Sequence, residues 1–365
     1  MINRPETESY TTHLAQLILS RYQKRQRQHQ PHQPPWPLPL QSPDSDPSAT
    51  TQASSLPPLR ILDLCTGTGC IPLLVHSLLA PHIANLQILG VDISPRAIAL
   101  ARKNLAHNIA KKTLSPVAET QIRFVRGDVL RAGSGSKASV DDTRRESGPV
   151  SHHDGRRRRK AGDGNREGNE YLSEDWHVVT CNPPYISQRA FNTCTARSVR
   201  NFEPRLALVP PSVSRLHAES DEADSCARSP SATSTPTPSK GQDERERCDN
   251  DDNGGDAFYP SVLAIAKRVK ARVLVMEVGD MAQAERVAGL ACALSSAEEG
   301  GGKEWEEVVI WRDWIDQRPF VADAGVGKEG RSVPGRDGGM RGVGQAGGEG
   351  NGRVVVCSRG CGVDR

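Results

Sequence analysis

Residues 59–128 alternate between strand-like and helix-like patterns, and this alternation restricts the possible folds more than any other feature of the chain. Short runs of branched apolar residues at 59–64, 86–91 and 122–125 are separated by segments whose apolar residues recur at helical spacing. Ser94 followed by Pro95 is typical of a helix N-cap and first turn. The order β-α-β-α-β predicts parallel strands joined by right-handed crossovers, which is the core of an α/β fold.

The strand-like pattern returns in the second half of the chain. Apolar runs at 178–181, 273–278, 308–311 and 353–357 predict four more strands, with helices at about 258–269 and from about Met281. Because no helix is expected between the last two strands, they should pair antiparallel at the sheet edge. The sequence thus predicts an α/β fold with a seven-stranded, mostly parallel sheet and an antiparallel edge hairpin.

Composition separates one folded core from several polar segments. Aromatic residues make up only 4% of the 365 residues, whereas Gly (33) and Pro (26) are abundant. We therefore expect a single core of roughly 200 residues. An N-terminal segment with a helix is predicted over 1–23 and a disordered linker over 24–57. The main domain, 58–365, is expected to carry low-complexity inserts at about 131–170, 211–255 and 322–351.

Polar or glycine residues follow the first three strands, at the edge where parallel α/β sheets bind ligands. The first strand runs into a tight turn whose candidate ligand residues are Asp63, Thr66, Gly67 and Gly69. Asp92 ends the second strand, where a carboxylate can accept from both hydroxyls of a ribose. Asp128 follows the third strand, where it could accept from an adenine amino group. Each has a structural alternative: Asp92 could serve only to cap the next helix, and Asp128 could be only a turn residue after Gly127.

The turn after the first strand differs from the known phosphate-binding patterns. Cys65 stands where GxGxxG would have its first glycine, the third glycine is absent, and GxxxxGK[ST] does not occur there. A ligand with a compact charged tail, such as the amino-acid end of S-adenosylmethionine, suits a turn of this kind.

The strand at 178–181 ends in Asn182-Pro183-Pro184-Tyr185. The two prolines remove two N–H donors and fix two φ angles, so the neighbouring carbonyls and the Asn182 side chain are held out as acceptors. Tyr185 adds a flat face beside them. Such a loop can hold a planar NH₂ group and present its nitrogen for reaction; a plain Pro-rich turn is the alternative.

Together these motifs resemble the HemK/PrmC family of protein-(glutamine-N5) methyltransferases, within the class I S-adenosylmethionine-dependent fold. The matching pieces are Arg4–Glu8 (RPETE), the Asp63–Gly69 turn, Asp92, Asp128, Asn182–Tyr185 (NPPY), Phe202–Leu208 (FEPRLAL), Gly255–Tyr259 (GDAFY) and Met276–Gly279 (MEVG). NPPY is shared with methyltransferases that act on adenine and other amino groups, whereas RPETE and FEPRLAL are far more specific.

The resemblance implies methylation of the glutamine side chain in the Gly-Gly-Gln motif of a class 1 peptide-chain release factor, with S-adenosylmethionine as methyl donor. Asn182 and Pro183 would accept the two amide N–H bonds, and Tyr185 would pack on the amide plane. Asn182 to Tyr185, with Glu6 and Glu8, would form the substrate side. The cofactor would be bound by Asp63, Thr66, Gly67, Gly69, Asp92, Asp128 and Asn182.

Two other functions stay open at this point. One is an amino-methyltransferase acting on nucleic acid (adenine N6-type), although no ordered basic face with aromatic residues is apparent. The other is a catalytically impaired cofactor-binding remnant, because family members carry a helical domain before RPETE and here Met1 stands three residues before Arg4.

Location and partners follow mainly from the resemblance. The long inserts indicate the eukaryotic, organellar type, hence a mitochondrial location, with a cytoplasmic one as the alternative, since no clear targeting peptide is seen. No apolar run approaches the length of a membrane span. No CxxC pair occurs, and Cys357 and Cys361, with three residues between them, have no second pair to complete a metal site. We expect a monomer without a metal, acting on a protein and not on nucleic acid.

Overall fold

The computed structural model describes residues 5–29, 58–134, 170–211, 253–294, 305–312, 331–334, 340–346 and 352–359. Arg4, most of the predicted linker and most of the predicted inserts lie outside these ranges. Among the described helices, none combines the length and the apolar character needed to cross a membrane.

Strands and helices alternate along the chain as the sequence predicts. The strands are β1 (Leu59–Leu64), β2 (Leu86–Asp92), β3 (Ile122–Arg126), β4 (Val178–Cys181), β5 (Val273–Glu277), β6 (Glu307–Arg312), β7 (Arg331–Pro334), β8 (Met340–Ala346) and β9 (Gly352–Ser358). The helices are α1 (Pro5–His29), α2 (Cys70–Leu79), α3 (Pro95–Ala110), α4 (Ala118–Gln121), α5 (Val129–Gly133), α6 (Gln188–Thr193), α7 (Arg197–Phe202), α8 (Tyr259–Arg268) and α9 (Met281–Leu294). Short 3-10 helices are η1 (Glu170–Ser173), η2 (Arg205–Ala207) and η5 (Asn253–Asp256).

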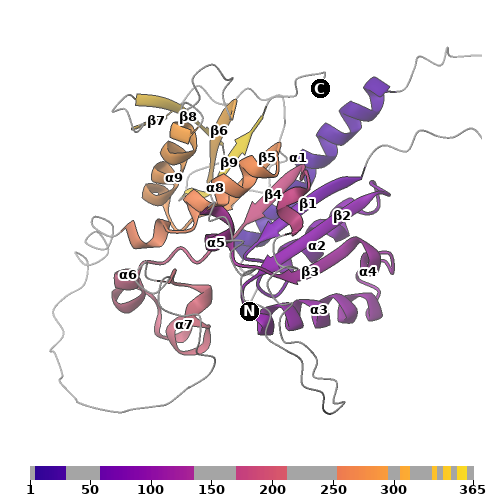
Figure 1. Cartoon of the computed structure of the whole chain (residues 1–365), viewed down its shortest axis with the longest axis horizontal. Coiled ribbons are helices and arrows are strands. Elements are labelled where there is room, and N and C mark those ends of the chain that lie inside the picture. Colours follow the sequence, from indigo (N-terminus) through magenta and orange to yellow (C-terminus); the bar gives the residue numbers. More distant parts are fainter. Residues whose placement is uncertain are drawn as a thin grey trace, which may run out of the picture.

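The strands form one sheet in the order β3-β2-β1-β4-β5-β9-β6-β8-β7 (Figure 1). The first five run parallel. β9 is antiparallel to both of its neighbours, β5 and β6, so the predicted antiparallel pairing of the last two strands is confirmed. β9 enters between β5 and β6 and is therefore not the outermost strand.

β7 and β8 extend the sheet beyond the seven predicted strands. They lie within 322–351, where a low-complexity insert was expected. Their sequences, Arg-Ser-Val-Pro and Met-Arg-Gly-Val-Gly-Gln-Ala, contain few apolar residues. Because strand prediction depends on apolar alternation, neither β7, a short polar strand at the sheet edge, nor β8, with two glycines, gives a signal.

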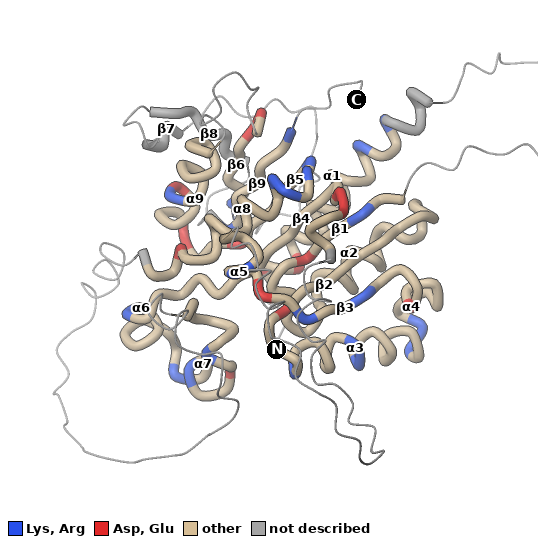
Figure 2. Tube along the Cα trace, viewed as in Figure 1, with Lys and Arg blue, Asp and Glu red and all other residues tan. Residues whose placement is uncertain are grey.

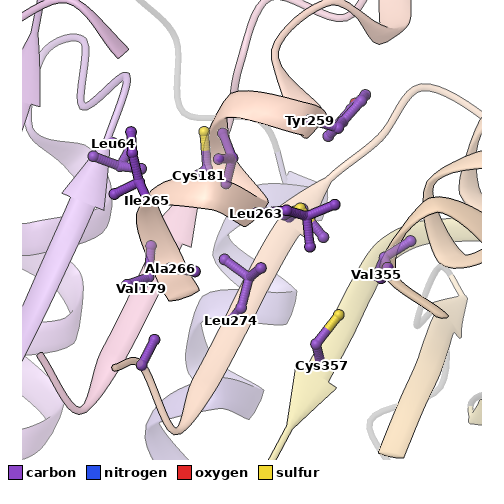
Figure 3. Packing of buried hydrophobic residues seen from close by; sticks show 14 of the residues in the cluster. Leu64, Val179, Cys181, Tyr259, Leu263, Ile265, Ala266, Leu274, Val355 and Cys357 are labelled. Atoms are coloured by element: carbon purple, nitrogen blue, oxygen red, sulfur yellow. The ribbon is translucent and has the colours of Figure 1, made fainter. Parts of the chain in front are cut away.

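Helices cover both faces of the sheet, and each face has its own core. On one face α1, α2 and α3 pack against strand residues such as Ile61, Ile88 and Val275. On the other face α5, α8 and α9 pack against residues such as Leu62 and Leu274. Figure 3 shows the second core, where Ile265 and Ala266 of α8 face Val179 and Leu274. Burial on both faces explains why the parallel strands are nearly continuous apolar runs.

The N-terminal helix α1 is longer than predicted. It begins at Pro5, a favourable first helical residue, and continues to His29, past the expected start of the linker at 24. The run Gln23-Lys24-Arg25-Gln26-Arg27-Gln28 consists of good helix formers, which explains the extension. Tyr10, Leu14 and Ile18 are buried against α2 and the sheet. Thr7, in the first turn of α1, bonds Glu277 at the end of β5, so this turn lies at the carboxyl edge of the strands (Figure 1).

Candidate active site

The strand order reverses between β1 and β4, and a pocket lies at the carboxyl ends of these two strands, as expected for an open α/β sheet. The pocket has about 670 Å³ of space, part of it open to solvent. The lining residues are Thr7, Cys65, Thr66, Gly67, Thr68, Cys70, Ile71, Asn182, Tyr185, Ile186, Glu203, Ala207, Leu208 and Glu277.

The turn after β1 is built by left-handed backbone conformations. Cys65, Gly67 and Gly69 have φ angles of 56°, 56° and 79°. A side chain at Gly69 would place its Cβ 2.8 Å from Cζ of Phe124, so both the φ angle and the space require glycine there. Cys65 adopts the same conformation at a cost of about 1 kcal/mol for a residue with a Cβ.

Asp92 is connected directly to this turn. Its Oδ2 accepts the N–H of Gly67 at 2.8 Å, and its Oδ1 accepts the N–H of Ser94 at 2.8 Å. Burial raises the pKa of the Asp92 carboxyl, while these two backbone hydrogen bonds lower it. A carboxylate has about four acceptor positions, so two backbone bonds orient Asp92 and leave capacity for further donors.

Asp63 lies beneath the turn and does not line the pocket. Its carboxylate is buried and accepts from Thr180 Oγ1 at 2.6 Å, which joins β1 to β4. Burial raises the pKa of Asp63 to about 7, although hydrogen bonds from the Thr180 and Thr66 hydroxyls lower it. Asp63 therefore supports the turn from below; its predicted contact with a cofactor stays a prediction.

Asp128 caps a helix that the sequence did not predict. Its Oδ1 accepts the N–H groups of Leu130 at 3.0 Å and Arg131 at 3.2 Å, at the start of α5. Asp92, Asp128 and Gly69, all predicted cofactor contacts, are not among the residues that line the pocket. Asp128 thus has a structural role, and the proposed contact with an adenine amino group is still a prediction.

The loop after β4 brings Asn182 and Tyr185 to the pocket, with Pro183 and Pro184 buried beside them. Two glycines allow other segments to approach Tyr185. A Cβ at Gly255 would lie 2.4 Å from the Tyr185 carbonyl oxygen, and one at Gly279 would lie 3.2 Å from Cδ2 of its ring. The GDAFY and MEVG segments, distant in sequence, thus pack directly on the loop.

Glu277, the last residue of β5, joins α1 to this loop. Its carboxylate is buried and accepts from Thr7 Oγ1 at 3.0 Å and from the Tyr185 hydroxyl at 3.4 Å. The Tyr259 hydroxyl donates to the Glu277 backbone carbonyl at 3.0 Å. Burial, followed by the nearby Glu277 and Asp63 carboxylates, raises the pKa of the Tyr10 hydroxyl, which also bonds Glu277.

Within RPETE, the structure brings Thr7 to the pocket and not the two glutamates that flank it. Glu8 is exposed and Glu6 is half-buried, and neither lines the pocket. Prediction from residue type missed Thr7, Glu203 and Glu277. The signals for them were present, since all three lie in segments that matched the family.

No protein-family model matches the chain. The chain is 36% identical over 155 residues to "Probable MRF1 mitochondrial N(5)-glutamine methyltransferase mtq1" of Schizosaccharomyces pombe, which covers 42% of this chain and 37% of that protein. It is 34% identical over 152 residues to "Mitochondrial MRF1 N(5)-glutamine methyltransferase MTQ1" of Saccharomyces cerevisiae, covering 42% and 33%. The resemblance to glutamine-N5 methyltransferases is confirmed.

The similarity extends to bacterial proteins but is limited in length. A release factor glutamine methyltransferase of Flavobacterium psychrophilum is 25% identical over 155 residues, covering 42% of this chain and 36% of that protein. The chain thus spans little more than a third of the curated relatives it matches. Among solved structures, "delta-N METTL16 MTase domain" covers 98% of this chain and 84% of that chain, with a TM-score of 0.39 and 8% identity.

Proposed function

We propose that this protein is an S-adenosylmethionine-dependent methyltransferase that methylates the side-chain amide nitrogen of the glutamine in the Gly-Gly-Gln motif of a class 1 peptide-chain release factor. One observation carries the proposal: residues of the turn after β1 line the same pocket as Asn182 and Tyr185. A methyl donor and a planar amide can therefore meet there. The sequence similarity to glutamine-N5 methyltransferases supports glutamine as the acceptor.

The charges of the pocket fit this cofactor. Its lining includes the carboxylates of Glu203 and Glu277 and, among the described residues, no Lys, Arg or His side chain. Such a lining favours a cationic ligand and disfavours phosphate. When bound, S-adenosylmethionine supplies a methyl group on a positively charged sulfur together with a charged amino-acid tail. We propose that Thr66, Gly67 and Asp92 hold it, with Asp63, Gly69, Asp128 and Asn182 completing the set.

On the acceptor side, the proposed work of the protein is positioning. An amide nitrogen is a poor nucleophile because its lone pair is delocalised into the carbonyl. Asn182 Oδ1 and the Pro183 carbonyl would accept its two N–H bonds, so that the nitrogen can become pyramidal with its lone pair directed at the methyl group. Tyr185 would pack on the amide plane. The gain comes from orientation and fixed dipoles. The proton that the nitrogen loses on methylation would pass to solvent, so no strong base is needed.

The rim of the pocket supports an extended protein substrate. Phe202 is 86% exposed and Leu206 is 50% exposed, and they flank the lining residue Glu203. We propose that these two side chains contact the chain on either side of the acceptor glutamine. The same segment supports the alternative acceptor, nucleic acid, because Arg189, Arg197 and Arg200 are exposed on α6 and α7 (Figure 2).

One experiment separates these acceptors. The chain is incubated with methyl-labelled S-adenosylmethionine, a mitochondrial class 1 release factor, the same factor with its Gly-Gly-Gln glutamine replaced by alanine, and DNA and RNA. We expect label on the unaltered release factor alone. Label only on nucleic acid would overturn the glutamine proposal. Absence of S-adenosylmethionine binding by calorimetry would overturn both enzyme functions and leave the impaired remnant.

We also propose a mitochondrial location, as the two fungal relatives are named mitochondrial. Fractionation of cells that express the tagged gene from its native locus tests this. Exclusive recovery of the protein in the cytosol would contradict it.

A further inference from the structure

Gln283, near the start of α9, connects three segments around the acceptor loop. Its Oε1 accepts the N–H of Gly279 at 2.7 Å, and its Nε2 donates to the Tyr185 carbonyl at 3.2 Å and to Asp256 Oδ1 at 2.8 Å. The side chain is 4% exposed. Both N–H bonds of its amide are thus used, and each goes to a different segment.

Part of this arrangement is an ordinary helix cap. Asp280 Oδ1 accepts the backbone N–H of Gln283 at 2.7 Å. An acidic N-cap followed three residues later by Gln resembles a capping box, in which the second side chain reaches back to a backbone N–H. The bond to Gly279 fits that function. The bond to Tyr185, 98 positions away in the sequence, does not, because it contributes nothing to the cap.

The acceptor loop has an unusual need for such a bond. Pro183 and Pro184 have no N–H groups, so this part of the loop cannot be held by backbone donors. Its carbonyls must be held instead, and Gln283 supplies a donor to the Tyr185 carbonyl. The next residue, Ile186, donates its N–H to the Leu208 carbonyl at 2.9 Å. The two bonds fix the end of the loop from opposite directions.

The bonding partners of Gln283 are themselves fixed against Tyr185. Asp256 is held by Arg286 through Nε–Oδ2 and Nη2–Oδ1 contacts of 2.7 and 3.1 Å. Gly255 precedes Asp256 in the sequence, and the Gly279 N–H donates to Gln283. These are the two glycines that pack on Tyr185. Gln283 therefore sets the spacing between the loop, the end of β5 and η5.

We propose that Gln283 is a positioning residue for methyl transfer: by holding the Tyr185 carbonyl, it fixes where Asn182 and Pro183 present the acceptor nitrogen. The inference rests on the proposed function for the identity of the acceptor. The effect of Gln283 on the mobility of the Asn182–Tyr185 loop can be measured without any acceptor.

The test removes the bond to Tyr185 with a double variant, Gln283→Glu with Asp256→Asn. This pair keeps the acceptor for the Gly279 N–H and exchanges donor and acceptor between 283 and 256. It removes the donor that Gln283 gives to the Tyr185 carbonyl and, because an amide replaces the carboxylate, one of the two hydrogen bonds from Arg286 to residue 256. We expect kcat to fall by about 10²-fold, the loss typical of a displaced reacting group, with unchanged S-adenosylmethionine affinity. Hydrogen exchange at the Tyr185 and Ile186 amides should become faster.

Two controls accompany the double variant. Asp256→Asn alone keeps an acceptor for Gln283 and loses one hydrogen bond from Arg286, as the double variant does, so its loss of kcat should be much smaller than that of the double variant. Gln121→Met removes another bridging glutamine, which bonds His76 Nε2 at 2.9 Å and the Ala84 carbonyl at 2.7 Å; it should leave both kcat and exchange in the loop unchanged.

Unchanged kcat and unchanged exchange in the double variant would overturn the inference, as would a loss of kcat equalled by Gln121→Met. If the unaltered protein does not methylate glutamine but the exchange result holds, the proposed function fails while the immobilising role of Gln283 stands.

Discussion

The two sides of the pocket are held together in different ways. On the cofactor side, the turn after β1 is fixed by residues close in sequence, such as Asp92, which bonds Gly67 25 positions away and Ser94 two positions away. On the acceptor side, Tyr185 is bonded by Glu277 and Gln283 from 92 and 98 positions away, and Thr7 reaches Glu277 across 270 positions. The cofactor side depends mostly on residues close in sequence, with the Asp63–Thr180 bond across 117 positions as the exception. The acceptor side is assembled by the tertiary structure. Substitutions on the acceptor side should therefore affect transfer without affecting cofactor binding.

The largest expected effect is that of Asn182→Ala, which should lower kcat by at least about 10²–10³-fold because it removes an acceptor aimed at the reacting group. S-adenosylmethionine affinity, measured by calorimetry, should stay within a few-fold. Asn182 also belongs to the proposed cofactor set, so a small rise in Kd fits the comparison. A large rise would break it, because cofactor binding would then depend on the acceptor loop.

Gly69→Ala tests the cofactor side. The φ angle of 79° and the 2.8 Å approach to Phe124 should distort the turn, costing about 1–3 kcal/mol of stability and weakening cofactor binding. Titration calorimetry and urea unfolding measure the two effects. Because the change lies outside the acceptor loop, kcat at saturating cofactor should change less than the affinity for S-adenosylmethionine. A larger change in kcat than in affinity would contradict the separation of the pocket into a cofactor side and an acceptor side.

Asp63→Asn should remove a pH dependence. The folded pKa of about 7 lies above the usual value of 3.8, so ionising Asp63 costs folding energy. Below about pH 4 the carboxyl is protonated in both the folded and the unfolded state and does not change the free energy of unfolding. Between about pH 4 and pH 7 that free energy falls progressively, by at most a few kcal/mol in all. Relative to Asp63→Asn, the unaltered protein should lose stability across this range. A parallel pH dependence of urea unfolding for both proteins would show that the carboxyl does not titrate there.

Thr7→Val tests the long-range connection and should have the smallest effect. It deprives the buried Glu277 carboxylate of one donor, which costs about 1–3 kcal/mol. We expect a higher KM for the acceptor and unchanged cofactor affinity. Thr12→Val is the matched control, because the Thr12 hydroxyl bonds only within α1, to the Glu8 carbonyl. Equal kinetic effects from both substitutions would remove the special role of Thr7.

Sequence reasoning succeeded where the signal is local. Asp63–Gly69 and Asn182–Tyr185 were located correctly at the ends of β1 and β4, and the predicted Ser94 cap of α3 is confirmed by its acceptance of the Ala97 N–H at 3.3 Å. It failed where composition hid the pattern, as in β7 and β8. It also gave no indication that α6 and α7 form beside the pocket.

The sequence by itself determined the alternating strands and helices, the Gly-rich turn and the acceptor loop, because apolar periodicity, glycine and proline act on the backbone over a few residues. Only the tertiary structure decided that Thr7 and not Glu6 or Glu8 reaches the pocket, that Asp128 caps a helix, and that Gln283 holds Tyr185. These outcomes depend on which side chains meet when α1, β4, β5 and α9 pack at one edge of the sheet. No local pattern encodes contacts between residues 90 or more positions apart.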